Sequence, residues 1–195
     1  MVSRMRLFTG LSIPPHVIAP LEGALKQLGE VTGVRWSPAE NLHVTLKFIG
    51  EWSDARLSEL EKALDAMTKP GAFSVAVARF GFLPNPHHPK IFFAGAHADA
   101  GLAELAAETD QTLARLGVRP EERPYTPHIT LARVGQALPP VLALRERIAE
   151  LASSGAAFDF GSFTAAEFHL YLSKPGPAGS VYTQLASYSL EKAAS

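Results

Sequence analysis

The chain has 195 residues, of which 47% are hydrophobic and 19% charged, a composition typical of a folded globular protein and unlike that of a disordered one. Its 18 basic and 19 acidic residues give a net charge of -1, which argues against a protein that coats long nucleic acids by neutralising their phosphates. Cysteine is absent from the sequence, which excludes disulfides, thiolate metal sites and cysteine nucleophiles.

The first half of the chain alternates between strand-like and helix-like patterns. Its first apolar run, Leu7 to Ile13, stops at Pro14-Pro15 and is too short to span a membrane, so we expect a strand there and a cytoplasmic protein. The expected elements are a strand over Arg6–Ile13, a helix after Pro15 that runs to about Gly29, a strand over Leu42–Ile49, and a helix N-capped by Ser53 with Leu57, Leu60, Leu64 and Met67 on one side.

The second half repeats this alternation, with several strands that follow one another directly. The expected elements are strands over Phe73–Phe80 and Ile91–Ala94, a helix over Asp99–Leu116, a strand over Thr126–Val134, a helix from Pro139 to Leu151, and strands over Glu167–Leu172 and Val181–Leu190. Direct connections between strands favour antiparallel pairing, so we predict the α+β class. No linker divides the chain, and we expect one domain over residues 1–195.

A short polar motif occurs once in each half. Residues 41–48 read Asn-Leu-His-Val-Thr-Leu-Lys-Phe, and residues 127–133 read Pro-His-Ile-Thr-Leu-Ala-Arg. Side chains alternate between the two faces of a strand, so His43 and Thr45 share one face, as do His128 and Thr130. The apolar residues between them anchor each strand in a core. Each motif therefore presents an imidazole and a hydroxyl on its polar face.

This pair of motifs suits chemistry at phosphorus. Residues two apart on a strand face lie roughly 6.5 Å apart, a span that fits a phosphate group. In-line displacement needs one group to take a proton from the attacking oxygen and another to give a proton to the departing oxygen. Histidine can do either near neutral pH because its ordinary pKa is about 6.5. We therefore expect His43 and His128 to be a general acid and base, with Thr45 and Thr130 bound to phosphate oxygens.

The two motifs resemble those of the 2H phosphoesterase superfamily, whose hallmark is a pair of His-x-Thr/Ser sequences. Within it the chain is most similar to the bacterial RNA 2′,3′-cyclic phosphodiesterases, first described as 2′-5′ RNA ligases. The specific matches are Asn41–Glu51 and Arg123–Arg133, and the similarity covers nearly the whole chain. The resemblance implies a two-lobed, pseudo-symmetric fold, with antiparallel sheets lining a central cleft and helices packed outside.

The resemblance also implies an activity and roles for the two histidines. It implies hydrolysis of 2′,3′-cyclic phosphate ends of RNA or nucleotides to a 2′-phosphate, without metal or other cofactor, and with a possible reverse ligation to 2′-5′ linkages. It assigns water activation to His128 and protonation of the leaving 3′-oxygen to His43, an assignment that symmetry alone leaves open. Neither a membrane nor an obligate protein partner is implied.

Two cations are candidates for the phosphate. Strict alternation places Lys47 on the face of His43 and Thr45, where it either binds phosphate or is a solvated charge. The resemblance implies that Arg133 contacts phosphate, whereas strict alternation places it opposite His128. Contact would require a bulge or a strand end near Ala132.

Other residues are weaker candidates. His87-His88 lies on a proline-rich loop without nearby carboxylates, so a surface loop is favoured over a metal pair, and a structural or rim role is favoured for His169. Aromatic side chains that could stack on a base, with core packing as the alternative, are Phe8, Trp36, Phe48 and Tyr125. Two rival functions stay open: hydrolysis of another cyclic or 2′-5′-linked nucleotide, and an RNA-end-binding module without turnover.

Overall fold

The computed structural model describes residues 3–29, 31–85, 87, 89–134, 138–176 and 179–190. Its strands and helices are β1 (Arg4–Ser12), α1 (Pro15–Leu28), β2 (Val34–Trp36), β3 (His43–Ser53), α2 (Leu57–Ala66), β4 (Phe73–Leu83), β5 (Ile91–His97), α3 (Gly101–Ala114), β6 (His128–Val134), α4 (Leu138–Ser153), β7 (Asp159–Ala165), β8 (Glu167–Gly176) and β9 (Gly179–Ser189). Short 3₁₀ turns, Ala39–Asn41 and Asp54–Arg56, precede β3 and α2.

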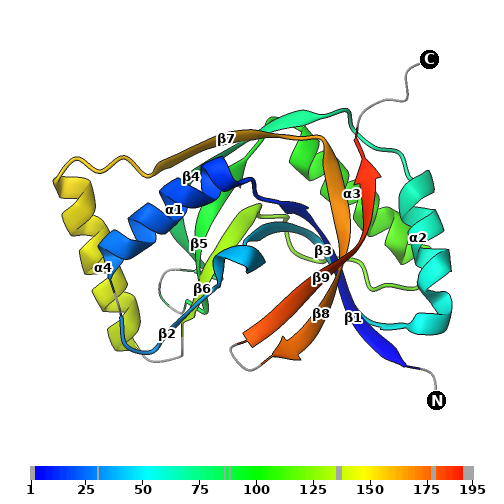
Figure 1. Ribbon diagram of the computed structural model, residues 1–195, viewed down its shortest axis with the longest axis horizontal. Coiled ribbons are helices and arrows are strands. Elements are labelled where there is room, and N and C mark those ends of the chain that lie inside the picture. The colour runs from blue at the N-terminus through cyan, green and yellow to red at the C-terminus, as the bar shows by residue number, and fades with distance from the viewer. Residues whose placement is uncertain are drawn as a thin grey trace.

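The strands form a strongly curled antiparallel sheet in the order β7-β4-β5-β6-β3-β1-β8-β9, with β2 paired to β6 (Figure 1). One lobe comprises strands β4 to β7, and the other lobe comprises β1, β3, β8 and β9. The two lobes meet where β3 pairs with β6, at Val44 and Ile129. This arrangement confirms the predicted α+β class and its two-lobed plan, with both lobes contributing to one continuous sheet.

The helices pack outside the sheet, as predicted (Figure 1). Helix α1 packs against β7 and α4, whereas α3 packs against β3 and α2. Helix α1 follows β1 but packs on a strand of the other lobe, and α3 follows β5 but likewise packs on a strand of the other lobe. The apolar side chains between the helices and the sheet, among them Leu21, Leu105 and Leu144, are fully buried. Burial of this apolar surface fixes the central strands on which the two motifs lie.

Three details differ from the predicted elements. Strand β2 has only three residues and β7 begins with Asp-Phe-Gly-Ser, so neither shows the alternating pattern that marks a strand in sequence. Ser53 is followed by a 3₁₀ turn and makes no side-chain capping bond, so the predicted N-cap is wrong. The helix itself is present, and its Leu60 and Leu64 are buried as its periodicity indicates.

Candidate active site: two histidine strands side by side

The two motifs lie on neighbouring antiparallel strands. Val44 pairs with Ile129, and both are fully buried. The residues that flank this pair point to the opposite face, so His43 lies next to Thr130 and Thr45 lies next to His128. We call this side of the sheet the histidine face. On an ideal ladder such diagonal neighbours as the two histidines are about 7–8 Å apart, with room for a group between the imidazoles.

Each imidazole is oriented by the same backbone contact. The Nδ1–H of His43 donates to the carbonyl of Asn41 at 2.7 Å, and that of His128 donates to the carbonyl of Thr126 at 2.7 Å. Because a carbonyl oxygen only accepts hydrogen bonds, Nδ1 carries a proton in both rings. Nε2 is therefore the atom that can gain or lose a proton in each histidine.

Burial affects both histidines in the same direction. It lowers the pKa of His43, a hydrogen bond to the Asn41 carbonyl opposes this shift, and the neighbouring His128 lowers the pKa further. Burial likewise lowers the pKa of His128. Without an anion at the site, the neutral form is thus favoured in both rings, and a bound phosphate would favour protonation. The Nε2 of His43 also lies 3.0 Å from the Thr45 hydroxyl oxygen.

Aromatic rings surround His43. The ring of Phe8 lies 4.7 Å from it, that of Tyr182 lies 5.2 Å away edge-on, and that of Tyr171 lies 6.2 Å away. Gly10 lets the strands come this close, because a Cβ there would lie 2.7 Å from the Val44 carbonyl oxygen. Sequence patterns did not single out Gly10, Tyr171 or Tyr182, since these residues join His43 only through the sheet register.

The four aromatic stacking candidates differ in their surroundings. Phe48 is 63% exposed, with its ring 6.1 Å from that of Phe8. Phe8 is buried, with its ring against those of His43, Tyr171 and Tyr182. Trp36 packs against Phe92 at the core. Tyr125 is half-buried and its hydroxyl donates to the Thr45 carbonyl at 2.9 Å. This bond ties the segment that precedes His128 to the first motif strand.

A bulge determines where Arg133 points. In the β5–β6 pairing Phe93 lies opposite Thr130 and Phe92 lies opposite Ala132, which leaves Leu131 as an extra residue. Both Leu131 and Ala132 are buried, so the alternation shifts by one position and Arg133 lies on the same face as His128 and Thr130. Its side chain is exposed. The bulge that contact with phosphate would require is therefore present.

A second bulge, in β3, overturns the prediction that Lys47 shares the face of His43 and Thr45. In the β1–β3 pairing Gly10 lies opposite Thr45 and Thr9 lies opposite Lys47, so Leu46 is extra. The shift turns Lys47 away from the histidine face. In this position only 6% of the residue is exposed. It forms an ion pair with Asp110 of α3 and donates to the Arg119 carbonyl at 2.7 Å. Lys47 is neither on the predicted face nor a solvated rim charge.

Two other histidines have different surroundings. His169 is 2% exposed and its ring nitrogens contact the hydroxyls of Ser12 and Ser187 at 3.2 and 3.1 Å. His87 is exposed, and His88 lies outside the described residues. Within the part of the chain that the structure describes, no three His, Asp or Glu side chains converge as a metal site would require, and no helix there is long and apolar enough to cross a membrane.

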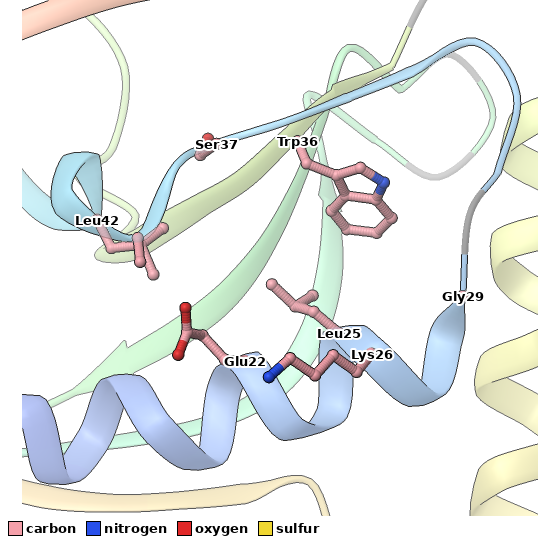
Figure 2. Close-up of a pocket in the computed structure, with 8 residues that line it drawn as sticks. Glu22, Leu25, Lys26, Gly29, Trp36, Ser37 and Leu42 are labelled. Carbon is pink, nitrogen blue, oxygen red and sulfur yellow. The ribbon is translucent and has the colours of Figure 1, made fainter.

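A pocket of about 400 Å³ lies on the other side of the sheet from the histidines. It is bounded by α1 and by the segment that runs from β2 into β3 (Figure 2). Leu25 and Trp36 form its apolar wall, with Glu22 and Lys26 at the helix. Trp36 points to the core face because it alternates with Arg35 on β2. The pocket is therefore separate from the paired motifs.

Comparisons with known proteins identify a family that matches most of the chain. Residues 11–93 and 96–182 match the family described as LigT-like phosphoesterases. The chain is 30% identical over 182 residues to an RNA 2′,3′-cyclic phosphodiesterase of Archaeoglobus fulgidus, covering 93% of this chain and 98% of that one. It is 32% identical over 178 residues to the protein of that name from Methanocaldococcus jannaschii, with coverage of 91% and 96%.

Solved structures show the same fold. A protein of Thermus thermophilus superposes with a TM-score of 0.77 at 28% identity, covering 95% of this chain and 98% of that one. E. coli LigT complexed with 3′-AMP superposes with a TM-score of 0.78 at 25% identity, covering 97% and 100%. Family match, relatives and fold agree, and the chain belongs to the LigT-like phosphoesterase family of 2H enzymes.

Proposed function

We propose that this protein hydrolyses 2′,3′-cyclic phosphate ends of RNA to 2′-phosphates, with His43 as general acid and His128 as general base. The observation that carries the proposal is the alternating arrangement of the two motifs, in which each imidazole lies beside the hydroxyl of the other strand. A carbonyl holds each Nδ1, which leaves Nε2 as the atom that exchanges a proton. The names of the relatives from Archaeoglobus fulgidus and Methanocaldococcus jannaschii support the substrate class.

The proton transfers balance over one turnover. Nε2 of neutral His128 takes a proton from water as the water oxygen bonds to phosphorus. The bond from phosphorus to the 3′-oxygen breaks, and the protonated Nε2 of His43 gives that oxygen its proton. The products are a 2′-phosphate and a 3′-hydroxyl, and proton exchange with solvent restores the two histidines. The same displacement with a 5′-hydroxyl in place of water, His128 taking the hydroxyl proton and His43 protonating the departing 3′-oxygen, would form a 2′-5′ linkage.

The aromatic surroundings support the assignment of the two roles. The exposed ring of Phe48 lies beside Phe8, which packs on His43, and it offers a flat surface on which a base can stack. A nucleoside bound there lies on the His43 side of the phosphate. The leaving oxygen stays on that nucleoside, so the nearer histidine is the one that protonates it. His128 is then on the side from which water attacks.

The phosphate itself is held by hydroxyls and a guanidinium. In this proposal Thr45 and Thr130 donate to its oxygens, and Arg133 offers a planar fork that can hold two oxygens at once. Thr→Val at either position removes a hydrogen bond to a charged group and should lower kcat/KM roughly tenfold to a hundredfold. Arg133→Lys should restore only part of what Arg133→Ala loses, because an ammonium is a point charge.

A turnover assay tests the proposal against its rivals. The substrates are a 2′,3′-cyclic mononucleotide, a short RNA with a cyclic end and a 2′-5′-linked dinucleotide, each with excess chelator. We expect hydrolysis of the cyclic ends to a 2′-phosphate, and no effect of chelator. Faster cleavage of the 2′-5′ dinucleotide would favour the second enzymatic reading. Binding of cyclic ends without turnover would favour a binding module, and loss of activity that one divalent ion restores would contradict the metal-free mechanism.

A further inference from the structure

Arg35 lies beside Arg133 on the histidine face. Strand β2 pairs antiparallel with the end of β6, and Arg35 is directly opposite Arg133 in this pairing. Directly opposed residues of an antiparallel pair point to the same side, with Cβ atoms roughly 5 Å apart. The alternate residue Trp36 packs on the core side against Phe92, at 6.0 Å. Arg35 therefore shares the side of the sheet that carries Arg133 and Thr130.

Neither guanidinium group has an acidic partner among the residues that the structure describes. Both side chains are exposed, and among the residues that the structure describes neither forms an ion pair or a hydrogen bond. By contrast, each of three exposed arginines elsewhere lies within 4 Å of a glutamate: Arg56, Arg119 and Arg147. Like charges directly opposite one another destabilise a sheet. The pair therefore costs stability until an anion lies between the two cations.

We propose that Arg35 and Arg133 together form a two-guanidinium site for the phosphate group, with Arg35 as its second arm. This inference rests on the proposed function, in which Arg133 holds the reacting phosphate. A cyclic phosphate diester carries one negative charge, whereas attack by water and formation of a phosphomonoester raise the charge towards two. A second guanidinium matches that increase. Arg35 thus favours the state in which charge has developed over the bound substrate.

The experiment measures binding of inorganic phosphate near pH 7.5 by calorimetry and by the rise in melting temperature, so it needs no turnover. The variants are Arg35→Gln, Arg133→Gln, the double variant and Arg35→Lys. Arg147→Gln, on the exposed surface of α4, is the matched control. We expect Arg35→Gln to weaken phosphate binding roughly tenfold to a hundredfold. Arg35→Lys should lose less, and Arg147→Gln should bind as the natural protein does.

Melting without phosphate separates this role from a structural one. Removing one of two repelling charges should leave the melting temperature of Arg35→Gln equal to or above that of the natural protein. A lower melting temperature together with unchanged phosphate affinity would identify Arg35 as a structural residue and overturn the inference. Unchanged affinity at an unchanged melting temperature would overturn it equally.

Together with the turnover assay on cyclic ends, these binding data distinguish failure of this inference from failure of the proposed function. If phosphate binding depends on Arg35 as expected but cyclic ends are not hydrolysed, the two-guanidinium site stands and the proposed function is wrong. If cyclic ends are hydrolysed while Arg35→Gln binds phosphate normally, only the role of Arg35 is wrong.

Discussion

At the scale of single residues, the central feature is that both imidazoles are held in one tautomer by a carbonyl two positions earlier in the chain. This contact depends only on a histidine at the start of a strand, so it follows locally from each motif. The position of the second imidazole depends on the sheet register instead. The motif strands therefore supply the chemistry, and the pairing of Val44 with Ile129 supplies the geometry.

The first prediction concerns the two histidines as a unit. His43→Ala and His128→Ala should each lower kcat by ~10²–10⁴-fold, the range expected for loss of a positioned acid or base. The double variant should be far less than multiplicatively worse, because either loss already disables proton transfer. Steady-state kinetics on a cyclic mononucleotide measure this. Near-full activity in either single variant would refute the pairing.

The second prediction concerns Phe48. Phe48→Ala should raise KM for a cyclic mononucleotide or lower its kcat/KM by roughly tenfold, since stacking on one base contributes about 1–3 kcal/mol. Phe48→Tyr keeps a flat ring and should keep most of the activity. Val181→Ala is a control, because Val181 is also an exposed apolar residue on a strand. Equal losses for Phe48→Ala and Phe48→Tyr would argue against stacking.

At the scale of elements, two bulges decide which cation faces the phosphate. Leu46 in β3 and Leu131 in β6 are both extra residues immediately after a His-x-Thr sequence. Each bulge exchanges the faces of the residues that follow, so Lys47 enters the core and Arg133 leaves it. Strict alternation of side chains predicted both motif faces correctly up to the bulges and failed after each of them, at Lys47 and at Arg133.

A bulge is hard to foresee from a sequence because it depends on the neighbouring strand. Here Lys47 is stabilised by Asp110, which lies 63 positions away on α3 (110 − 47). The sequence predicted the long alternating strands and the helices with buried leucines well, because their hydrophobic periodicity is a local pattern. Strand β2 was missed because three residues show no period, although it places Arg35 opposite Arg133.

The third prediction tests the position of Lys47. Lys47 is buried and Asp110 is partly buried, so Asp110→Ala leaves a cation with a single carbonyl partner and should lower the free energy of unfolding by about 1–3 kcal/mol. The kcat/KM of the folded enzyme should hardly change, because Lys47 lies on the other side of the sheet. Denaturant unfolding and kinetics on the same samples check both. A large loss of kcat/KM at unchanged stability would return Lys47 to the phosphate site.

At the scale of the whole molecule, the curled sheet brings two motifs from distant parts of the sequence onto one surface (Figure 1). Helices α1 and α3 each pack on a strand of the other lobe. The two histidines are thereby partly buried side by side, and the neighbouring His128 lowers the pKa of His43. An anion between them reverses this preference. Titration of the pair and binding of phosphate are therefore coupled.

The fourth prediction follows from this coupling. Burial lowers the pKa of His43 and of His128. In the free enzyme, the state with one neutral and one protonated ring should therefore be most populated below pH ~6.5, the ordinary pKa of histidine. The pH profile of kcat/KM should be bell-shaped with its maximum there. A bound phosphate raises both pKa values, so the kcat profile should be displaced to higher pH. Coincident or flat profiles would contradict this coupling.

The most direct test of the acid and base assignment uses a cyclic substrate in which sulfur replaces the departing 3′-oxygen. A thiol has an ordinary pKa of about 8.5, so a departing thiolate needs little help from an acid. Release of free thiol is measured with the natural enzyme, His43→Ala and His128→Ala. We predict that the sulfur substrate removes most of the defect of His43→Ala and leaves that of His128→Ala intact. Full defects in both variants, or rescue of His128→Ala alone, would contradict His43 as the acid and His128 as the base.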